Sequence, residues 1–279
     1  MIRKLLLQNK RQTESFPVLS KASKTGMKWW LEVALILFFY LIYSFARNQF
    51  GSASVSPSKA FENAEKIIDL EKSIGTYKEL QIQEFFIDWK WFIQFWNVFY
   101  GTFHFGVTIF ALVWLYIKFP SKYSRQRFFL LSSTGSALIG FSLFPLMPPR
   151  LLSNCGDFGA CLNNTYPFID TLSDIGGLWS FDSGTMQKVS NQFAAMPSLH
   201  FAWSFWCTLA LYPILKSRKT KALICIYPVA TTFSVIITAN HYWVDIVGGF
   251  VCLGIGFYAT KILMSSKLHL LPSSFRRNT

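Results

Sequence analysis

Two histidines and an aspartate form the clearest chemical pattern in this sequence. His241 and Asp245 are four residues apart, so on a helix the carboxylate can reach the imidazole ring. A carboxylate that accepts one ring N–H fixes the tautomer and leaves the other ring nitrogen free to attack or to abstract a proton. His200 lies elsewhere in the chain, in the run "MPSLH". A second, independently placed histidine can protonate a leaving group.

An arginine and a helix start add binding groups for an anion. Arg150 follows two prolines, and its planar guanidinium matches the oxygens of a phosphate group. Pro197 and Ser198 are expected at the start of a helix, where free N–H groups and the helix dipole favour an anion. Together with the two histidines, these groups predict a phosphoryl-transfer site.

A metal site is the rival interpretation of the same residues. Zinc accepts ligands such as His200, His241 and Asp245. An arginine beside them fits an anionic substrate better than a cation, so we expect no metal and no cofactor. A single histidine in a membrane helix is more commonly a hydrogen-bonding group of the bundle, and the functional interpretation therefore rests on the clusters taken jointly.

The composition indicates an integral membrane protein. The chain has 279 residues, of which 52% are hydrophobic and 18% aromatic, which is too apolar for an ordinary soluble domain. A bilayer-spanning helix needs about 20 apolar residues. The sequence predicts an all-α protein, a bundle of six transmembrane helices at residues 29–46, 93–117, 128–146, 198–215, 222–240 and 244–264.

The distribution of charge predicts the orientation in the membrane. The net charge of +13 comes from basic residues in alternate connections of the six-helix chain. The positive-inside rule places these segments and both termini in the cytoplasm, in contact with anionic lipid rather than nucleic acid. The basic segments are residues 1–28, 118–127, 216–221 and the end of the chain after Lys261.

The same topology places the three chemical clusters together. The connections 47–92 and 147–197, and the junction near His241, then face the extracytoplasmic side. Arg150, His200 and His241 would all lie on that side at similar depth, although only Lys and Arg positions were used to orient the chain. This agreement is the strongest support for one site and for a membrane lipid as its substrate.

The chain is expected to form a single membrane domain. Residues 1–28 and 265–279 are basic cytoplasmic tails, the first of which does not have the pattern of a cleavable signal, and residues 29–264 form the catalytic bundle. Residues 56–75 predict an amphipathic helix capped by Ser56 and ended by Gly75. This helix and residues 80–91 either lie in the plane of the membrane interface or form a lid on the bundle, and the glycine-rich stretch 245–257 predicts close helix packing.

Several other polar residues are candidates for the site. Asn97, Tyr100 and His104 share one face of the second span, and they either line the site or make hydrogen bonds between helices. Asn240, next to His241, is a further site-lining candidate. Cys155 and Cys161 share the outer loop 147–197, where they either form a disulfide or remain as thiols.

Four motifs, which cover roughly residues 90–260, resemble those of the type-2 phosphatidic acid phosphatase superfamily. They are "NVFYGTFHF", "PLMPPRLL", "AAMPSLHFAW" and "NHYWVDIVGG". The closest resemblance is to its inositolphosphotransferase branch, the branch of the inositol phosphorylceramide synthases. The resemblance implies a six-helix bundle, a metal-independent site and a phosphohistidine-type intermediate. It implies His241 as nucleophile, Asp245 as its orienting partner, His200 as the acid and Arg150 as a phosphate ligand.

Two departures from the superfamily pattern favour this branch over a general lipid phosphatase. The chain has "PSLH" where the superfamily often has "PSGH", and it has Ser234-Val235 where the superfamily often has a Ser-Arg pair. One phosphate-binding arginine is therefore missing from its usual place. Lys188 on the outer loop is the candidate for a second phosphate ligand.

The sequence therefore predicts a membrane phosphotransferase that moves a phosphoryl-containing group from a phospholipid to an alcohol. With water as acceptor, the same chemistry would make it a lipid phosphate phosphatase. A small transporter is a remote alternative, for which the repeated, broken helices typical of transporters are missing from the sequence pattern. The oligomeric state, the lipid head group and the acceptor are not predicted.

Overall fold

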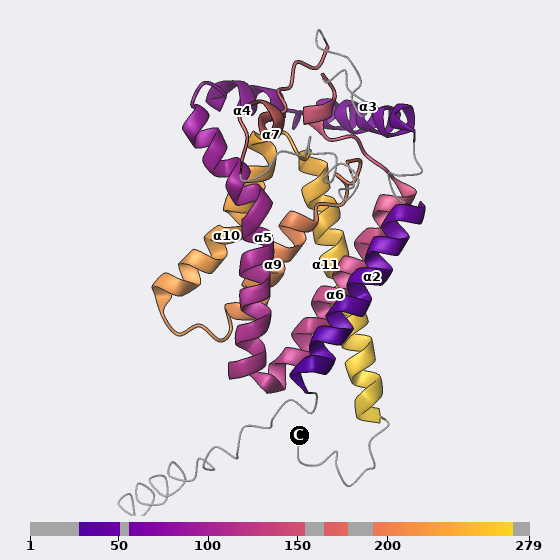
Figure 1. The fold of residues 1–279 in the computed structure, drawn as a ribbon, viewed down its shortest axis with the longest axis vertical. Helices are drawn as coiled ribbons and strands as arrows, with labels where there is room; N and C mark the ends of the chain where they lie inside the picture. The colour runs from indigo at the N-terminus through magenta and orange to yellow at the C-terminus, as the bar shows by residue number, and fades with distance from the viewer. Residues whose placement is uncertain (1–27, 51–55, 154–164, 178–191, 270–279) are drawn as a thin grey trace, which may run out of the picture.

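The computed structural model describes residues 28–50, 56–153, 165–177 and 192–269. In these residues the protein is all-helical and has no β-strand, apart from one isolated bridge between Leu146 and Ala194. The main helices run up and down beside one another (Figure 1). They are α2 (Trp29–Phe50), α5 (Lys90–Lys118), α6 (Pro120–Leu143), α9 (Leu199–Leu211), α10 (Arg218–Ile237) and α11 (Trp243–His269).

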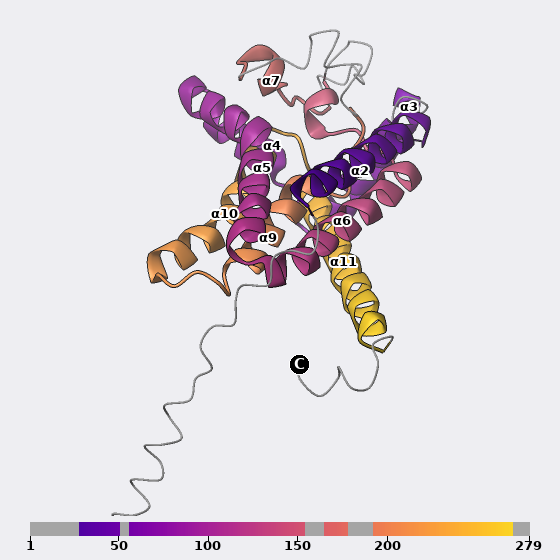
Figure 2. The ribbon, with the colours of Figure 1, turned by 60° about the horizontal axis from the view of Figure 1, so that its bottom comes forward.

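These helices form two packed groups. Helix α6 packs on α11 and α2, whereas α9 packs on α5 and α10 and also contacts α11. Both ribbon views show α5, α9 and α10 on one side and α2, α6 and α11 on the other (Figures 1 and 2). The contact of α9 with α11 therefore joins the two groups. Helix α9 carries His200 in its first turn, and α11 begins two residues after His241.

Within the described residues, three helices are long and apolar enough to cross a membrane: Lys90–Lys118, Arg218–Ile237 and Trp243–Met264. Two further apolar helices, Trp29–Ile42 and Leu199–Leu211, are shorter. The fourth predicted span, 198–215, was too long, because α9 ends at Leu211 and has only 13 residues. At 1.5 Å per residue it rises about 20 Å, which is less than the thickness of the hydrocarbon core.

The predicted amphipathic helix is confirmed as α3 (Pro57–Ser73). Ser56 is its N-cap and accepts a hydrogen bond from Lys59 N at 3.4 Å, and Gly75 follows it with a φ of +74°. The second predicted segment is shorter than expected, since α4 spans Glu79–Phe86 and a break at residues 87–89 precedes α5. Ile87, Asp88 and Trp89 thus separate α4 from the long helix.

Helix α3 lies across the upper end of the bundle (Figure 1). Its apolar stripe of Ala60, Ala64, Ile67 and Ile68 is buried in one cluster with side chains of the bundle end. Of the two expected arrangements, this packing favours a lid on the bundle. The bundle side chains of this cluster include Leu146, Met147, Ala195, Ala239 and Tyr242.

Glycines allow the start of α9 to enter between α6 and α11. A Cβ atom at Gly140 would lie 2.6 Å from Pro197 Cδ, and one at Gly248 would lie 3.0 Å from Pro197 Cβ. A Cβ at Gly249 would lie 2.8 Å from the carbonyl oxygen of Ser198. The close packing predicted for the glycine-rich stretch is therefore confirmed, and it brings the backbone before His200 against the helix that follows His241.

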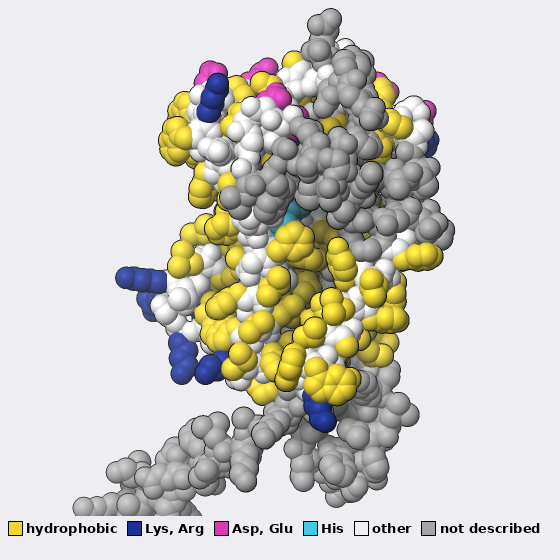
Figure 3. All heavy atoms as spheres, viewed as in Figure 1, with side chains coloured by type: hydrophobic (Ala, Val, Ile, Leu, Met, Phe, Trp, Pro, Cys, Tyr) yellow, Lys and Arg dark blue, Asp and Glu magenta, His cyan; other side chains and the backbone are white. Residues whose placement is uncertain are grey.

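The surface separates charge from apolar side chains. Acidic side chains gather at the upper end and most basic ones toward the lower end, with a belt of hydrophobic side chains between them (Figure 3). Glu32 is an exception, because it does not lie at the upper end. It is buried against Arg127 and accepts a hydrogen bond from the Tyr123 hydroxyl. A belt of this kind is expected where a protein contacts lipid rather than water.

Candidate active site

The three predicted catalytic residues form one hydrogen-bonded chain. His241 Nδ1 lies 3.0 Å from Asp245 Oδ2, and His241 Nε2 lies 3.4 Å from His200 Nδ1. A carboxylate oxygen can only accept, so Nδ1 of a neutral His241 carries the proton and Nε2 carries the lone pair. His241 is 3% exposed and Asp245 is fully buried. His241 therefore directs the lone pair of Nε2 toward the second histidine.

The start of α11 holds this chain in place. Asp245 Oδ2 accepts a second hydrogen bond from Tyr242 N at 2.9 Å, so one oxygen binds both the imidazole and the backbone. The other oxygen, Oδ1, is buried and has no hydrogen-bond partner among the described residues. Ser198 N donates to the backbone oxygen of Asp245 at 2.9 Å, which fixes the start of α9, and with it His200, to the same turn.

Ser198 acts in the structure as a helix cap. Its side-chain oxygen accepts a hydrogen bond from Phe201 N at 3.4 Å, and the residue is fully buried. Its own N–H is bound to Asp245. The expected helix start is therefore present, but Ser198 is not among the residues that line the cavity described below.

Arg150 lies in a 3-10 turn, η1 (Pro149–Leu151), and is buried in a polar network. Its Nε donates to Asn240 Oδ1 at 3.0 Å, its Nη1 to Asp170 Oδ2 at 2.6 Å and its Nη2 to Gln192 Oε1 at 2.6 Å. Its backbone N–H also binds Ala239 O. These bonds tie the arginine to the segment just before His241 and fix the plane of its guanidinium.

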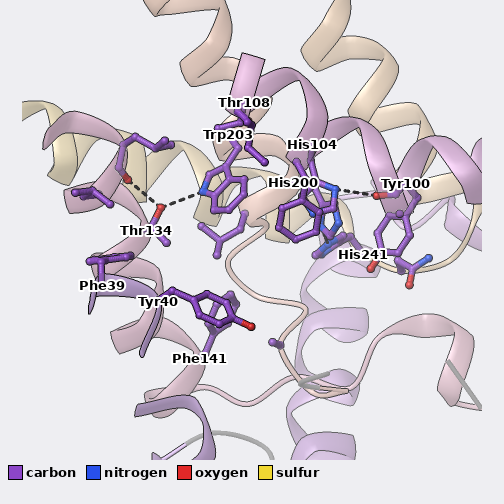
Figure 4. Close-up of a pocket in the computed structure, with 18 of the residues that line it drawn as sticks. Phe39, Tyr40, Tyr100, His104, Thr108, Thr134, Phe141, His200, Trp203 and His241 are labelled. Atoms are coloured by element: carbon purple, nitrogen blue, oxygen red, sulfur yellow. Dashed lines mark hydrogen bonds between the residues drawn. The ribbon is translucent and has the colours of Figure 1, made fainter. Parts of the chain in front are cut away.

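Two residues of the polar face of α5 meet His200. The Tyr100 ring stacks on the His200 ring with centroids 4.4 Å apart, and the His104 ring lies 4.1 Å from it. Figure 4 shows these rings around His200, next to His241. His104 Nδ1 donates to Tyr100 O at 2.9 Å, so Nε2 of a neutral His104 is an acceptor.

Asn97, on the same face, has a different environment. Its amide donates to Thr171 O and Gly176 O, both at 2.8 Å, and accepts from the Thr171 hydroxyl. It is buried and does not line the cavity. Of the two expected roles, the hydrogen-bonding one applies: Asn97 anchors the short helix α7 (Thr171–Asp174) to α5.

The site opens into a cavity of about 610 Å³ between the two groups of helices. Arg150, Asn240, His241 and His200 line its upper end. Below them the walls are mostly apolar and come from α2, α5, α6 and α9, and Figure 4 shows Tyr40 and Phe39 of α2 facing this space. The apolar lining includes Ile36, Leu37, Phe105, Ile109, Leu112, Leu130, Leu131, Phe141 and Trp203.

The cavity is elongated along the bundle. Its lining residues on α6 extend from Phe141 to Arg127, which corresponds to about 21 Å at 1.5 Å per residue. Trp203 Nε1 donates to Thr134 Oγ1 at 3.0 Å, so the polar atoms of these two wall residues are satisfied within the protein. A histidine is visible at the upper edge of the hydrophobic belt (Figure 3), which places imidazole groups next to the face that would contact lipid.

Some predicted site residues lie outside the described part of the chain. These are Lys188, Cys155 and Cys161. Among the described residues, no group of three or more His, Cys, Asp or Glu side chains is arranged to hold a metal ion.

Four polar residues near the site were not predicted from the sequence. Asp170 and Gln192 hold the Arg150 guanidinium, and Glu71 and Glu79 bind the first N–H groups of α11. One of them had a signal in the sequence: Glu71 continues the buried stripe of α3, three residues after Ile68. A carboxyl group on the apolar face of an amphipathic helix indicates a buried partner.

The protein combines helices that are long and apolar enough to cross a membrane with a buried His–Asp pair that faces a second histidine and an arginine. These are the groups of a phosphoryl-transfer enzyme. The family comparison agrees with this class. A profile of the PAP2 superfamily matches residues 65–259, well over half of the chain, so the protein belongs to the PAP2 superfamily. No curated protein and no solved structure matches the chain. Membership in this superfamily supports an enzyme with phosphatase or phosphotransferase chemistry.

Proposed function

We propose that the protein is a membrane-embedded phosphotransferase of the inositolphosphotransferase-like type. It moves a phosphoryl-containing group from a phospholipid to an alcohol acceptor, with a phosphohistidine-type intermediate. The observation that carries this proposal is the chain from Asp245 through His241 to His200, which opens into an apolar cavity beside Arg150.

In the first step His241 Nε2 attacks phosphorus. A P–N bond forms, and the P–O bond to the diacylglycerol portion of the donor breaks. The leaving oxygen takes a proton from the imidazolium form of His200, and the neutral His200 is then the base of the second step. Asp245 stabilises the positive charge that develops on His241, as in other carboxylate–histidine pairs.

In the second step the acceptor hydroxyl attacks the same phosphorus atom. His200 takes the hydroxyl proton, the P–N bond breaks, and the lone pair returns to His241. Tyr100 and His104 support this role, because their rings hold the His200 ring from the α5 side. Arg150 would bind the phosphate oxygens throughout, with Asp170 and Gln192 fixing its plane.

A second cation for the phosphate group is proposed from outside the described residues. Lys188 is the candidate, since the usual second arginine of the superfamily corresponds here to Val235. Val235 is fully buried in an apolar cluster with side chains of α9, α10 and α11. Asn240 could contribute a neutral hydrogen bond to the phosphate group from the cavity wall.

The elongated cavity supports a lipid donor. Its lining runs along about 21 Å of α6, roughly two thirds of the hydrocarbon thickness of a bilayer. Arg150 and the two histidines lie at its upper end, whereas Arg127 at the far end is paired with Glu32. A lipid could therefore place its head group beside His241 and an acyl chain between α2 and α5.

We also propose six membrane crossings, with α2, α6 and α9 completing the bundle and both termini in the cytoplasm. The clustering of acidic side chains at the end near the site, and of most basic ones toward the opposite end, supports an extracytoplasmic active site (Figure 3). No metal takes part in the proposed steps.

A lipid phosphate phosphatase is the second candidate function. The same residues would serve if water instead of an alcohol attacked the phosphohistidine, and superfamily membership is equally compatible with it. The two functions differ only in the acceptor and in the donor head group.

The test uses purified protein in detergent with EDTA present. Labelled phosphatidylinositol and labelled phosphatidic acid are incubated with and without ceramide or diacylglycerol, and free phosphate and new lipid products are measured separately. A new inositol-phosphate lipid that requires the acceptor and is lost in His241→Ala supports the transferase. Free phosphate from phosphatidic acid that is independent of acceptor supports the phosphatase, and turnover that survives in His241→Ala contradicts both.

A further inference from the structure

Three carboxyl groups converge on the first turn of α11. The first N–H groups of a helix have no partner within the helix and need acceptors from elsewhere. Here three successive N–H groups each bind a different carboxyl oxygen. The bonds run from Tyr242 N to Asp245 Oδ2 at 2.9 Å, from Trp243 N to Glu79 Oε1 at 3.2 Å, and from Val244 N to Glu71 Oε1 at 2.8 Å.

Two of these groups come from the lid helices rather than from α11. Glu71 lies in the last turn of α3 and Glu79 in the first turn of α4, and both are fully buried. Within the described residues neither has a Lys or Arg partner. A buried carboxyl without a cation is unfavourable unless another positive group compensates it, and the N-terminal end of α11 provides that charge.

The environment of Glu71 favours its protonated form at neutral pH. Burial, and then the adjacent Glu79 carboxyl, raise the pKa of Glu71 to about 9. Glu71 Oε2 is buried without a hydrogen-bond partner in the described residues, and such an oxygen is far less costly as a neutral hydroxyl than as an anion. The other titratable groups facing Glu71 are Asp245 of α11 and the phenols of Tyr77 and Tyr242; the Lys72 ammonium lies over the Tyr77 ring.

We propose that Glu71 and Glu79 are positioning residues for the reacting histidine. They fix the first turn of α11, and this turn carries the Asp245 carboxylate that binds His241. Since Asp245 Oδ2 accepts from both Tyr242 N and His241 Nδ1, a displacement of the turn would displace the imidazole with it. The inference rests on the proposed function, because it requires His241 to be the reacting group.

The first experiment measures kcat and KM of purified Glu71→Ala, Glu71→Gln and Glu79→Ala. The alanine variants are expected to lose about 10- to 100-fold in kcat, the size of effect that a small misplacement of reacting groups produces, with KM changed less than threefold. A glutamine oxygen can accept the Val244 N–H as the neutral acid does, so Glu71→Gln should recover most of the kcat that Glu71→Ala loses. Glu65→Gln is the matched control, since Glu65 is exposed on the same helix.

The second experiment tests the proton on Glu71. The folded protein keeps this proton above the ordinary glutamate pKa of 4.5 and loses it near pH 9, whereas the unfolded chain has already released it. The wild-type unfolding free energy therefore decreases between these pH values through this group. Glu71→Gln has no such proton. Its thermal midpoint, measured relative to that of the wild type, should therefore increase from pH 5 to pH 9. A difference that is constant with pH would overturn the assignment of the proton.

The outcomes separate this inference from the proposed function. Turnover that survives in His241→Ala contradicts the proposed function itself. If His241→Ala is inactive but both alanine variants keep the wild-type kcat, Glu71 and Glu79 do not position the site. If Glu71→Ala fails to fold, the Glu79→Ala kinetics and the pH series of Glu71→Gln still decide the question.

Discussion

The starts of α9 and α11 carry the two histidines of the site, and they are built differently. The start of α9 is capped locally, by the Ser198 side chain on Phe201 N three residues later. At the start of α11, two of the N–H groups bind Glu71 and Glu79, which precede them by more than 160 residues. The start of α9 is thus capped by its own segment, whereas the start of α11 is capped by the lid.

The two starts also constrain each other. Ser198 N binds the backbone oxygen of Asp245, and Gly249 allows the backbone of Ser198 to approach α11 closely. The distance between His200 Nδ1 and His241 Nε2 is a result of this contact. We therefore expect the site to require both the local cap and the long-range ones.

The largest effect is expected for Asp245→Asn. An amide nitrogen can donate to His241 Nδ1 and stabilise the wrong tautomer, so the nucleophilic lone pair would no longer face His200. We expect a loss of about 10⁴-fold in turnover, as for the equivalent change in other carboxylate–histidine pairs, measured with the labelled-lipid assay. A loss of less than tenfold would indicate that Asp245 does not set the tautomer.

Gly249→Ala tests the contact between the two helix starts. Its Cβ would lie 2.8 Å from Ser198 O, so one of the two backbones must move. Overpacking of this kind costs about 1–3 kcal/mol, and we expect a lower thermal midpoint together with a loss of turnover. Gly254→Ala is the control, because its Cβ would contact nothing within 4 Å.

Ser198→Ala removes the local cap of α9. The expected cost is about 1 kcal/mol of stability, visible in thermal unfolding, with a smaller loss of turnover than in the α11 cap variants. A large increase in KM with unchanged stability would instead show that Ser198 binds the phosphate group.

The smallest effect on chemistry is expected far from both helix starts. Leu131→Trp would narrow the cavity on α6, well below the histidines. Competition between short-chain and long-chain donors should then shift toward the short-chain lipid, with turnover of the short-chain lipid kept. No shift in chain preference would show that the acyl chain lies elsewhere.

The sequence predicted what depends on local pattern. The amphipathic α3, the glycine contacts of α11 and the meeting of His200, His241 and Asp245 followed from spacing, hydropathy and charge. The length of α9 was overestimated, because apolar residues continue past Leu211 after the helix has ended. The pairing of Arg150 with Asp170 and Gln192 was missed, because the contact between these segments leaves no periodic pattern in the sequence.

The Glu71 and Glu79 caps show the same limit most clearly. The position of Glu71 on the buried side of α3 is visible in the sequence as a break in an apolar pattern. The partners of both carboxyl groups, the backbone N–H groups of α11, carry no residue-specific signal. Only the folded arrangement of α3 and α4 over α11 identifies them.

The most direct test of the account is to trap the covalent intermediate. Protein is mixed with a donor lipid labelled at phosphorus, quenched within one turnover and separated from lipid under denaturing conditions. The account predicts protein-bound label that is stable in base, labile in acid, present in the wild type and absent in His241→Ala. Label that remains in His241→Ala, or turnover in the wild type without any trapped label, would contradict the assignment of His241 as the nucleophile.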